Sequence, residues 1–162
     1  MSGIAMAEGP SALRVRRALE ARLDRVVTLA RELLASTLFA RGDDHRGTFR
    51  EAQLRNAVVV AGSTESLEAI KSWVRYQVGR EAGRGGWRHR DFGEALVRQI
   101  EQELAALASE IATTADAAEV QPAIHVALTR QYLGYLHRHF VFAEMERQRE
   151  RRTAQAARGS GR

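Results

Sequence analysis

Histidines are the side chains of this chain best suited to proton transfer near neutral pH. His137 and His139 lie two residues apart, so on a helix they point in well-separated directions and are not expected to bind one metal ion. His45 and His89 lie in or beside polar stretches, where they would form an acid–base pair only through a tertiary contact. We therefore expect exposed structural histidines. A small ribonuclease that uses His45 or His89 is kept as an alternative, and its activity would vanish on His→Ala substitution.

Carboxylates and thiols offer no clearer catalytic pattern. The glutamates of one segment lack the Glu-x-x-His partners of helical-bundle metal sites, and a solvated or partner-facing helix surface explains them better; they are Glu94, Glu101, Glu103 and Glu110. The chain has no Cys, which excludes disulfides, thiolate zinc sites and cysteine nucleophiles. It also lacks a phosphate-binding Gly-rich loop, a Gly-x-Ser-x-Gly turn and a His-Glu-x-x-His helix. We therefore predict a protein that is not an enzyme, with no catalytic, cofactor-binding or metal-binding residues.

Basic residues outnumber acidic ones, 25 to 20, and Lys71 is the only lysine among them. Guanidinium groups match phosphate oxygens and stack on bases, whereas a GC-rich genome would explain the choice of Arg but not the net charge of +5. The charge is segregated: residues 46–90 carry nine basic and four acidic groups, residues 91–120 one and seven, and residues 121–162 eight and three. Neighbouring helices that pair with each other explain the acidic block best. The alternative is a phosphate-binding face beside a face for basic partners.

The segment over residues 67–80 is the most informative. Its apolar residues share one face of a helix, and its basic and aromatic residues border or oppose that face; these are Lys71, Trp73, Arg75, Tyr76 and Arg80. In one interpretation phosphates meet the cations while an aromatic ring packs on sugar or base. In the other the helix is buried on two sides, with the aromatic rings in the core. A short Gly- and Arg-containing loop follows, with Arg84, Trp87 and Arg88.

Composition favours helices as the elements that position these residues. The chain has 162 residues, 44% hydrophobic and 28% charged, with two prolines, so one all-α domain is expected. Apolar residues at spacings of three and four predict a bundle of about five helices, over residues 11–40, 48–62, 63–83, 91–111 and 122–152. The bundle is assigned to residues 1–146, with its core over about 11–146, and residues 147–162 to an Arg-rich, disordered tail.

Capping patterns predict where the helices begin. Two stretches match the capping box, Thr48-Phe-Arg-Glu51 and Asp91-Phe-Gly-Glu94. Caps and a first-turn proline mark the other starts, which are expected at Ser11, at Ser63 or Thr64, and at Pro122. No apolar run of about 18 residues and no signal-peptide pattern is present, so we expect a cytoplasmic protein without a membrane segment.

Two stretches of the chain carry the motifs of a known family. Leu54-Arg55-Asn56 follows a helix start at residue 48, and Leu67-Glu-Ala-Ile70-Lys71 is followed by Tyr76-Gln-Val-Gly79-Arg80. These motifs resemble Leu-Arg-Asn, Leu-x-x-Leu-Lys and Tyr-x-x-Gly-Arg in the small helical-bundle subunit of type III-A CRISPR effector (Csm) complexes, and the solitary lysine falls on the family's lysine. The aromatic-rich residues 132–140 are similar to the family's last helix. The likeness covers about residues 48–142, and the family's Thr-Thr-Ser opening is replaced by Arg50-Glu51-Ala52.

The resemblance implies a non-catalytic subunit. In the family several copies stack along a ribonucleoprotein filament, beside the subunits that hold the guide RNA, and contact the guide–target duplex through basic residues. The matching positions here are Arg55, Lys71, Arg75 and Arg80, and the loop that follows adds Arg84 and Arg88. A subunit that accepts any target sequence needs cations on a rigid face that bind phosphate and sugar. The acidic fourth helix would then meet a basic face of the next copy, in head-to-tail stacking that does not close into a ring.

We therefore predict a CRISPR-associated, RNA-binding small subunit of a type III effector complex that acts in antiviral defence. Its expected partners are guide RNA, target RNA, other effector subunits and further copies of itself. The alternative from another class is a helical protein–protein scaffold whose basic face binds an acidic partner surface. A weak salt dependence of RNA binding would favour that alternative.

Overall fold

The structure is a computed structural model that describes residues 9–42 and 48–159. Within these residues every regular element is helical and no strand occurs, so the predicted all-α class is confirmed. In chain order the elements are α1 (Pro10–Glu20), α2 (Leu23–Ser36), α3 (Glu51–Gly62), α4 (Leu67–Arg80), the 3₁₀ helix η1 (Gly86–Asp91), α5 (Phe92–Gln99), the π-helical turn η2 (Ile100–Leu104), α6 (Ala105–Ala115), the 3₁₀ turn η3 (Ala118–Val120) and α7 (Gln121–Gly159).

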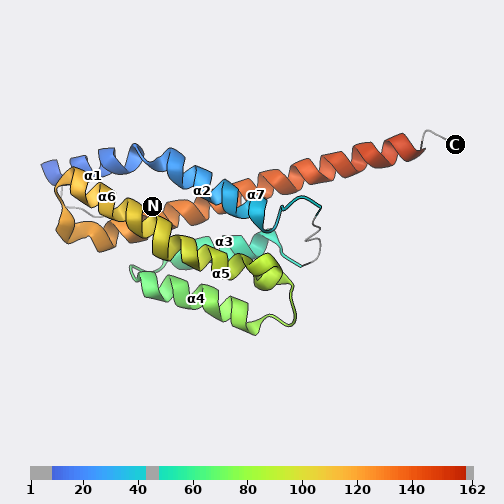
Figure 1. The fold of residues 1–162 in the computed structure, drawn as a ribbon, viewed down its shortest axis with the longest axis horizontal. Helices are drawn as coiled ribbons and strands as arrows, with labels where there is room; N and C mark the ends of the chain where they lie inside the picture. Colours follow the sequence, from blue (N-terminus) through green and yellow to red (C-terminus); the bar gives the residue numbers. More distant parts are fainter. Residues whose placement is uncertain (1–8, 43–47, 160–162) are drawn as a thin grey trace.

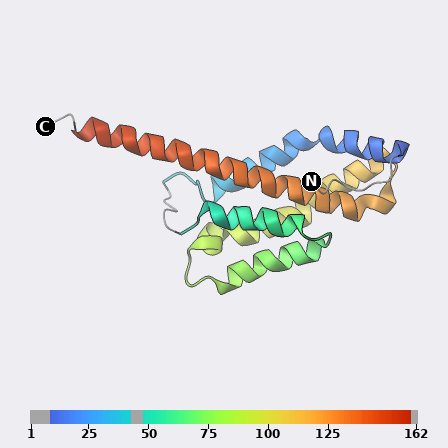
Figure 2. The ribbon, with the colours of Figure 1, turned by 180° about the vertical axis from the view of Figure 1, so that it is seen from behind.

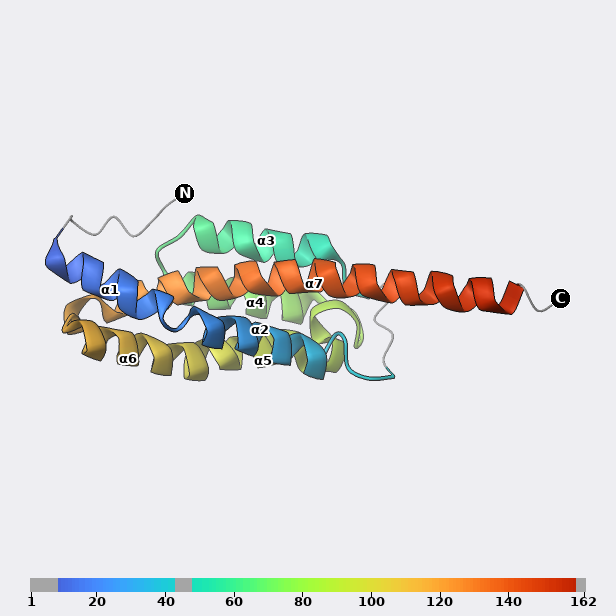
Figure 3. The same ribbon diagram turned by 90° about the horizontal axis from the view of Figure 1, so that it is seen from above.

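The long helix α7 is the axis around which the bundle is built. It packs against α2, α3 and α6, while α1 lies on α6 and α4 on α5 (Figure 3). Its 39 residues extend for roughly 58 Å at 1.5 Å per residue, which is longer than the bundle. The C-terminal part of α7 therefore continues beyond one end of the bundle (Figures 1 and 2).

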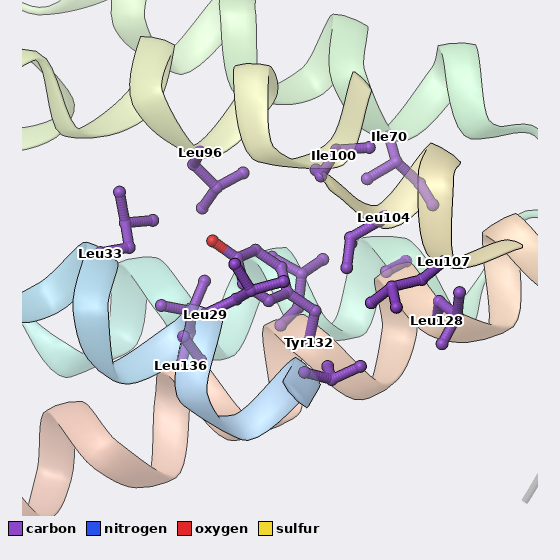
Figure 4. Close-up of a cluster of buried hydrophobic side chains, with 14 of the residues drawn as sticks. Leu29, Leu33, Ile70, Leu96, Ile100, Leu104, Leu107, Leu128, Tyr132 and Leu136 are labelled. Atoms are coloured by element: carbon purple, nitrogen blue, oxygen red, sulfur yellow. The ribbon is translucent and has the colours of Figure 1, made fainter. Parts of the chain in front are cut away.

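The core lies along one face of α7. Residues at intervals of four along this helix are fully buried, namely Ile124, Leu128, Tyr132, Leu136 and Phe140. Leucines and isoleucines of α2, α4, α5, η2 and α6 close around the Tyr132 ring (Figure 4). The Tyr132 hydroxyl donates a hydrogen bond to the side-chain oxygen of Gln99, and burial raises the pKa of Tyr132. This bond satisfies the one polar group that the ring carries into the core.

The first predicted helix is two helices in the structure. The chain bends at Ala21 and Arg22, where Arg22 leaves the helical conformation with φ −111° and ψ 1°. The Arg22 guanidinium donates to the Ala18 carbonyl (2.9 Å) and to the Thr114 hydroxyl of α6 (2.9 Å). It thereby satisfies a carbonyl at the end of α1 and ties the bend to α6. The bend lets α1 pack on α6 and α2 on α7, which one straight helix does not do.

Two of the predicted helix starts are shifted, one by a proline and one by a local hydrogen bond. α1 begins at Pro10 after the N-cap Gly9, not after Ser11, because proline fits the first helical position. α3 begins after Arg50, and the Gln53 side-chain oxygen accepts from the Arg50 N–H (2.8 Å). This bond replaces the predicted capping box from Thr48 to Glu51.

The predicted caps of the next two helices also differ from the structure. Ser66 caps α4, because its hydroxyl accepts from the Ala69 N–H (3.1 Å). The Thr64 hydroxyl instead accepts from the Ser66 N–H, just before the helix begins (3.0 Å). Asp91 does precede α5, but its backbone is left-handed (φ 56°) and its side chain makes no cap hydrogen bond. The preceding residues 86–91 form η1, where the sequence predicted a plain loop.

The fourth predicted helix is one continuous run over residues 92–115 that contains a π-helical turn. The wider turn η2 covers Ile100–Leu104, and the His125 Nε2 atom lies 2.7 Å from the Ile100 carbonyl oxygen. A carbonyl only accepts, so His125 donates from Nε2. A side chain of α7 thus satisfies a carbonyl at the turn where the α-helical ladder is interrupted.

The last helix is longer than predicted. It begins at Gln121, beside the expected Pro122, and continues to Gly159, where the sequence predicted a disordered tail from residue 147. Ala, Gln and Arg are strong helix formers, and Thr153 bonds back to the Arg149 carbonyl (3.1 Å). Residues 152–159 are exposed throughout. Over the described ranges, none of the helices has both the length and the apolar character required to cross a membrane.

Candidate nucleic-acid interface

The two basic residues that border the apolar face of α4 are held by carboxylates of the same chain. Lys71 is only 7% exposed, and its Nζ lies 2.5 Å from Glu68 and 3.1 Å from Glu101. Arg75 also contacts Glu101, at 2.7 Å. Burial lowers the pKa of Lys71. The hydrogen bonds to Glu68 and Glu101 and the charges of these carboxylates together raise it by more than burial lowers it, so the net shift is upward.

Glu101 is the centre of this group. Hydrogen bonds first from Lys71 and then from Arg75, together with the charges of both, lower the pKa of Glu101, and partial burial opposes this shift without reversing it. The three charges therefore join α4 to η2. In the sequence prediction Lys71 and Arg75 were RNA-binding candidates; in the structure both are engaged in this intramolecular cluster.

Pairing between helices also accounts for other carboxylates of the acidic block. Glu103 pairs with Arg25 of α2 (3.4 Å), and Glu110 pairs with Arg22 at the α1–α2 bend (3.3 Å). Glu94 is exposed and has no ion pair within the described part of the chain. Intramolecular pairing, which the sequence favoured for this block, is thus what the structure contains at Glu101, Glu103 and Glu110.

An aromatic cluster supports the loop that follows α4. Trp87 is 1% exposed and stacks on Phe92 at a centroid distance of 5.6 Å. Phe49 and Trp73 meet the Trp87 ring edge to face at 5.2 and 5.8 Å. Trp87 therefore belongs to the core and the partly buried Trp73 packs against it. Of the aromatic residues in this region Tyr76 alone keeps a largely exposed ring, at 62%.

Two glycines give the loop its path. Gly83 and Gly86 both have positive φ, 80° and 56°, which residues with a Cβ rarely adopt. A Cβ on Gly86 would lie 2.3 Å from the Glu81 carboxylate, which would have to move aside, so the positive φ is the main reason for glycine at this position. The Arg88 guanidinium lies 3.4 Å from the Gly83 carbonyl oxygen, to which it donates. The loop is thus a tight turn that presents its arginines from a packed base.

The arginines at this place are exposed at the surface, although the Arg88 guanidinium also donates to backbone carbonyls of the loop. Arg80 lies over the Tyr76 ring, 5.8 Å from its centroid, and Arg84 and Arg88 are exposed. Within the described residues none of these three arginines forms an ion pair. We call the exposed group the basic end; it consists of Arg50, Arg55, Tyr76, Arg80, Arg84 and Arg88.

Two helices bring the basic end together. α3 and α4 lie side by side and run in opposite directions (Figures 1 and 2), so the start of α3 is beside the end of α4. Gln53 of α3 contacts Glu81, which follows α4, at 3.4 Å. Arg55 is exposed and contacts Glu51 one turn earlier (3.3 Å). α7 leaves the bundle at this same end (Figure 1).

The histidines do not assemble into an acid–base pair in the described residues. His137 contacts Glu51 at 2.6 Å, while burial and the charge of Arg31 lower the pKa of His139. His89 is half-buried in η1, and His45 lies outside the described residues. In the described ranges no three His, Asp or Glu side chains gather in a way that would hold a metal ion.

No family model, curated protein or solved structure matches this chain.

Of the six residues that the sequence singled out for RNA, the structure groups four. Arg55, Arg80, Arg84 and Arg88 share the basic end, and Arg75 and Lys71 are paired with Glu101. Sequence reasoning missed Arg50, because the predicted cap at Thr48 placed it inside a helix. It also missed that Trp87 is buried, since a Gly- and Arg-rich stretch usually indicates a flexible, solvated loop.

Proposed function

We propose that this protein binds RNA through the sugar–phosphate backbone, as a non-catalytic small subunit of a type III CRISPR effector complex. The observation that supports it is the set of exposed arginines Arg80, Arg84 and Arg88, which lack carboxylate partners among the described residues and rest on a packed aromatic base. Arginine forks bind phosphate oxygens without reading base edges. The exposed Tyr76 ring offers a surface for one base or sugar.

The proposed contact set differs from the one that the resemblance implies. Lys71 is buried and paired with two glutamates, so RNA would have to compete with the fold for its charge. Arg75 shares Glu101 with Lys71. We therefore assign the lysine motif to the stability of the α4–η2 contact and RNA binding to Arg80, Arg84 and Arg88. Arg55, like Arg75, already has a carboxylate partner, Glu51.

Head-to-tail stacking of copies along RNA is part of the proposal. Reversing the charge of Glu101 or Arg75 would not test it, because the two residues already pair with each other within one chain and either reversal would disturb the fold. Stacking would instead appear as cooperative binding, with several copies sedimenting on a long RNA and one copy on an RNA of a single site's length.

The RNA-binding part is tested by fluorescence anisotropy with two unrelated RNAs. The test variant is Arg80→Glu/Arg84→Glu, and its matched control is Arg16→Glu/Arg17→Glu on the exposed side of α1. Both variants change the net charge equally, and each places one substitution in the last turn of a helix. We expect both RNAs to bind alike and the first variant to bind more weakly. Its log K–log[salt] slope should fall by roughly 1.4, about 0.7 for each phosphate that the variant leaves without a cation. Equal binding by the two variants would contradict the assignment.

The CRISPR part requires a different readout. Protein carrying an affinity tag is purified from its own cells, and the bound RNA is extracted and sequenced. We expect guide RNAs that carry CRISPR-repeat sequence to be enriched over total RNA, together with co-purifying effector subunits. Bound RNA with the composition of the bulk transcriptome would leave an RNA-binding protein of another class.

A further inference from the structure

The stretch of α7 that leaves the bundle exposes large apolar side chains. Val141 is 45% exposed, Phe142 59% and Met145 39%. The other large exposed apolar residues of the described chain, Leu13, Val59 and Tyr76, lie on three different helices. Val141, Phe142 and Met145 are neighbours on one helix at spacings of one, three and four, so they form a single patch.

Basic residues continue this patch along the helix. Positions 138, 141, 145, 148 and 152 repeat at intervals of three and four, the spacing of a helix seam that packs on a second helix. We call this surface the outer face of α7; it consists of Arg138, Val141, Phe142, Met145, Arg149 and Arg152. It covers about four helical turns, roughly 22 Å.

The opposite side of the same stretch is occupied by the chain itself. Phe140 is buried and meets Phe39 edge to face at 5.4 Å, and the Arg147 guanidinium lies 4.6 Å from the centroid of the Phe39 ring. The residues after α2 therefore cover the inner side of α7 here. The outer face has no such cover in the described chain, because Val141, Phe142 and Met145 remain exposed.

The charge of the outer face selects its partner. Glu144 and Glu150 lie outside this face, roughly 110° and 130° from its centre at 100° per residue, and Glu146 at its border is paired with Arg149 at 3.4 Å. Arg138 and Arg152 thus stand on both sides of the apolar patch, and neither forms an ion pair within the described residues. From this geometry we propose that the outer face docks an acidic amphipathic helix of another protein.

Two other occupants fit the face less well. In a pair of α7 helices, parallel or antiparallel, the arginines of one copy would meet those of the other, which repel. RNA would pair with the arginines and stack a base on Phe142 alone, whereas Val141 and Met145 offer no ring and would stay uncovered. A partner helix with an apolar stripe flanked by acidic residues would cover the apolar patch and also pair with the arginines.

The test uses the full chain and two fluorescent helical peptides of about 21 residues, with Leu at the seam positions. One peptide carries Glu and the other Lys at the flanking positions. We expect the acidic peptide to bind and Phe142→Ser/Met145→Ser to weaken it by at least about tenfold. Val59→Ser, an equally exposed apolar residue of α3, is the matched control and should leave the affinity unchanged. Arg138→Glu/Arg152→Glu should reverse the preference toward the basic peptide.

Several results would overturn the proposal. These are equal binding of both peptides, no binding of the acidic peptide up to about 100 µM, or an equal loss with Val59→Ser. A dimer of the wild type that Phe142→Ser/Met145→Ser dissociates would assign the face to a second copy. Loss of RNA binding alone in that variant would assign it to RNA. The proposal does not rest on RNA binding at the basic end, so Arg80→Glu/Arg84→Glu should leave the peptide affinity unchanged.

Discussion

Lys71 shows how one buried charge changes the interpretation of a motif. A lysine at the border of a helix face suggests a phosphate contact, yet here its Nζ is shared by Glu68 and Glu101. Removing one partner from such a cluster leaves another charge without compensation, so these residues are coupled. The consequences for stability and for RNA binding can be separated by two substitutions.

Glu101→Gln is expected to lower stability near neutral pH and to have less effect in acid. Because the pKa of Glu101 is lowered in the folded state, its charged form stabilises the fold. That contribution is fully present above the ordinary carboxyl pKa and is lost as pH falls through the lowered folded value. The free energies of unfolding of wild type and variant, measured in urea, should therefore differ at pH 7 and become equal in acid.

The control is Glu103→Gln, whose pair with Arg25 is half exposed on both sides and should contribute less. A difference in the free energy of unfolding between wild type and Glu101→Gln that is the same at every pH would show that the cluster does not depend on the charge of Glu101.

Lys71→Met is expected to leave RNA affinity unchanged within about twofold, since the Lys71 ammonium is buried and a flexible apolar side chain can fill its place. Anisotropy with the same RNAs measures this. A loss as large as that of Arg80→Glu/Arg84→Glu would return Lys71 to the contact set.

At the scale of elements, close contact between α4 and α5 depends on one glycine. A Cβ on Gly93 would lie 2.3 Å from the Val78 Cγ2 atom and 3.0 Å from the Trp87 carbonyl oxygen. Valine has few rotamers and the carbonyl belongs to the backbone, so neither neighbour moves away easily. The packing that buries Trp87 and supports the arginine loop therefore requires a residue without a side chain at position 93.

Gly93→Ala is expected to destabilise the protein by about 1–3 kcal/mol through this overpacking. Gly79→Ala is the matched control, because nothing lies within 4 Å of a Cβ there, and alanine should stabilise α4 by up to about 1 kcal/mol. Urea denaturation of both variants gives the comparison. If the two substitutions shift stability in the same direction, the contact between α4 and α5 is looser than the structure shows.

At the scale of the molecule, α7 is both the centre of the core and a projection from it. Its first half carries the row of buried residues from Ile124 to Phe140, and residues 152–159 are exposed. The basic end and the outer face of α7 lie at the same end of the bundle (Figure 1). An RNA backbone and a protein helix would thus be bound side by side at that end.

Truncation after Arg151 tests whether the last turns of α7 contribute to the stability of the bundle. Because residues 152–159 bury no side chain, we expect the Tm to change by less than about 2 °C. The helical signal in circular dichroism should fall in proportion to the helical residues removed, whereas a disordered tail would leave the total helical signal unchanged. A large drop in Tm would mean that this segment packs on the bundle.

The sequence determined the helical class and most of the helix positions, because apolar residues at intervals of three and four need only local geometry. It also indicated that the acidic block is paired, since opposite charges were grouped in adjacent segments. Helix starts were misplaced at Ser11, Thr48 and Ser63, where several polar residues in succession compete for the same free N–H groups. That α7 continues past Arg152 to Gly159 was missed because Arg-rich sequence resembles a solvated tail.

Only the tertiary structure decided which cations are paired within the chain and which remain exposed. Lys71 and Arg80 stand on the same helix with the same charge, but Glu101 approaches only the first from α5–η2. Likewise Trp87 is buried because Phe49, Trp73 and Phe92 come from three other segments of the chain. Such contacts join residues far apart in sequence, and no local pattern encodes them. The sequence thus supplies the candidate residues, and the packing of α4 against α5 and η2 separates those that hold the fold from those that remain exposed.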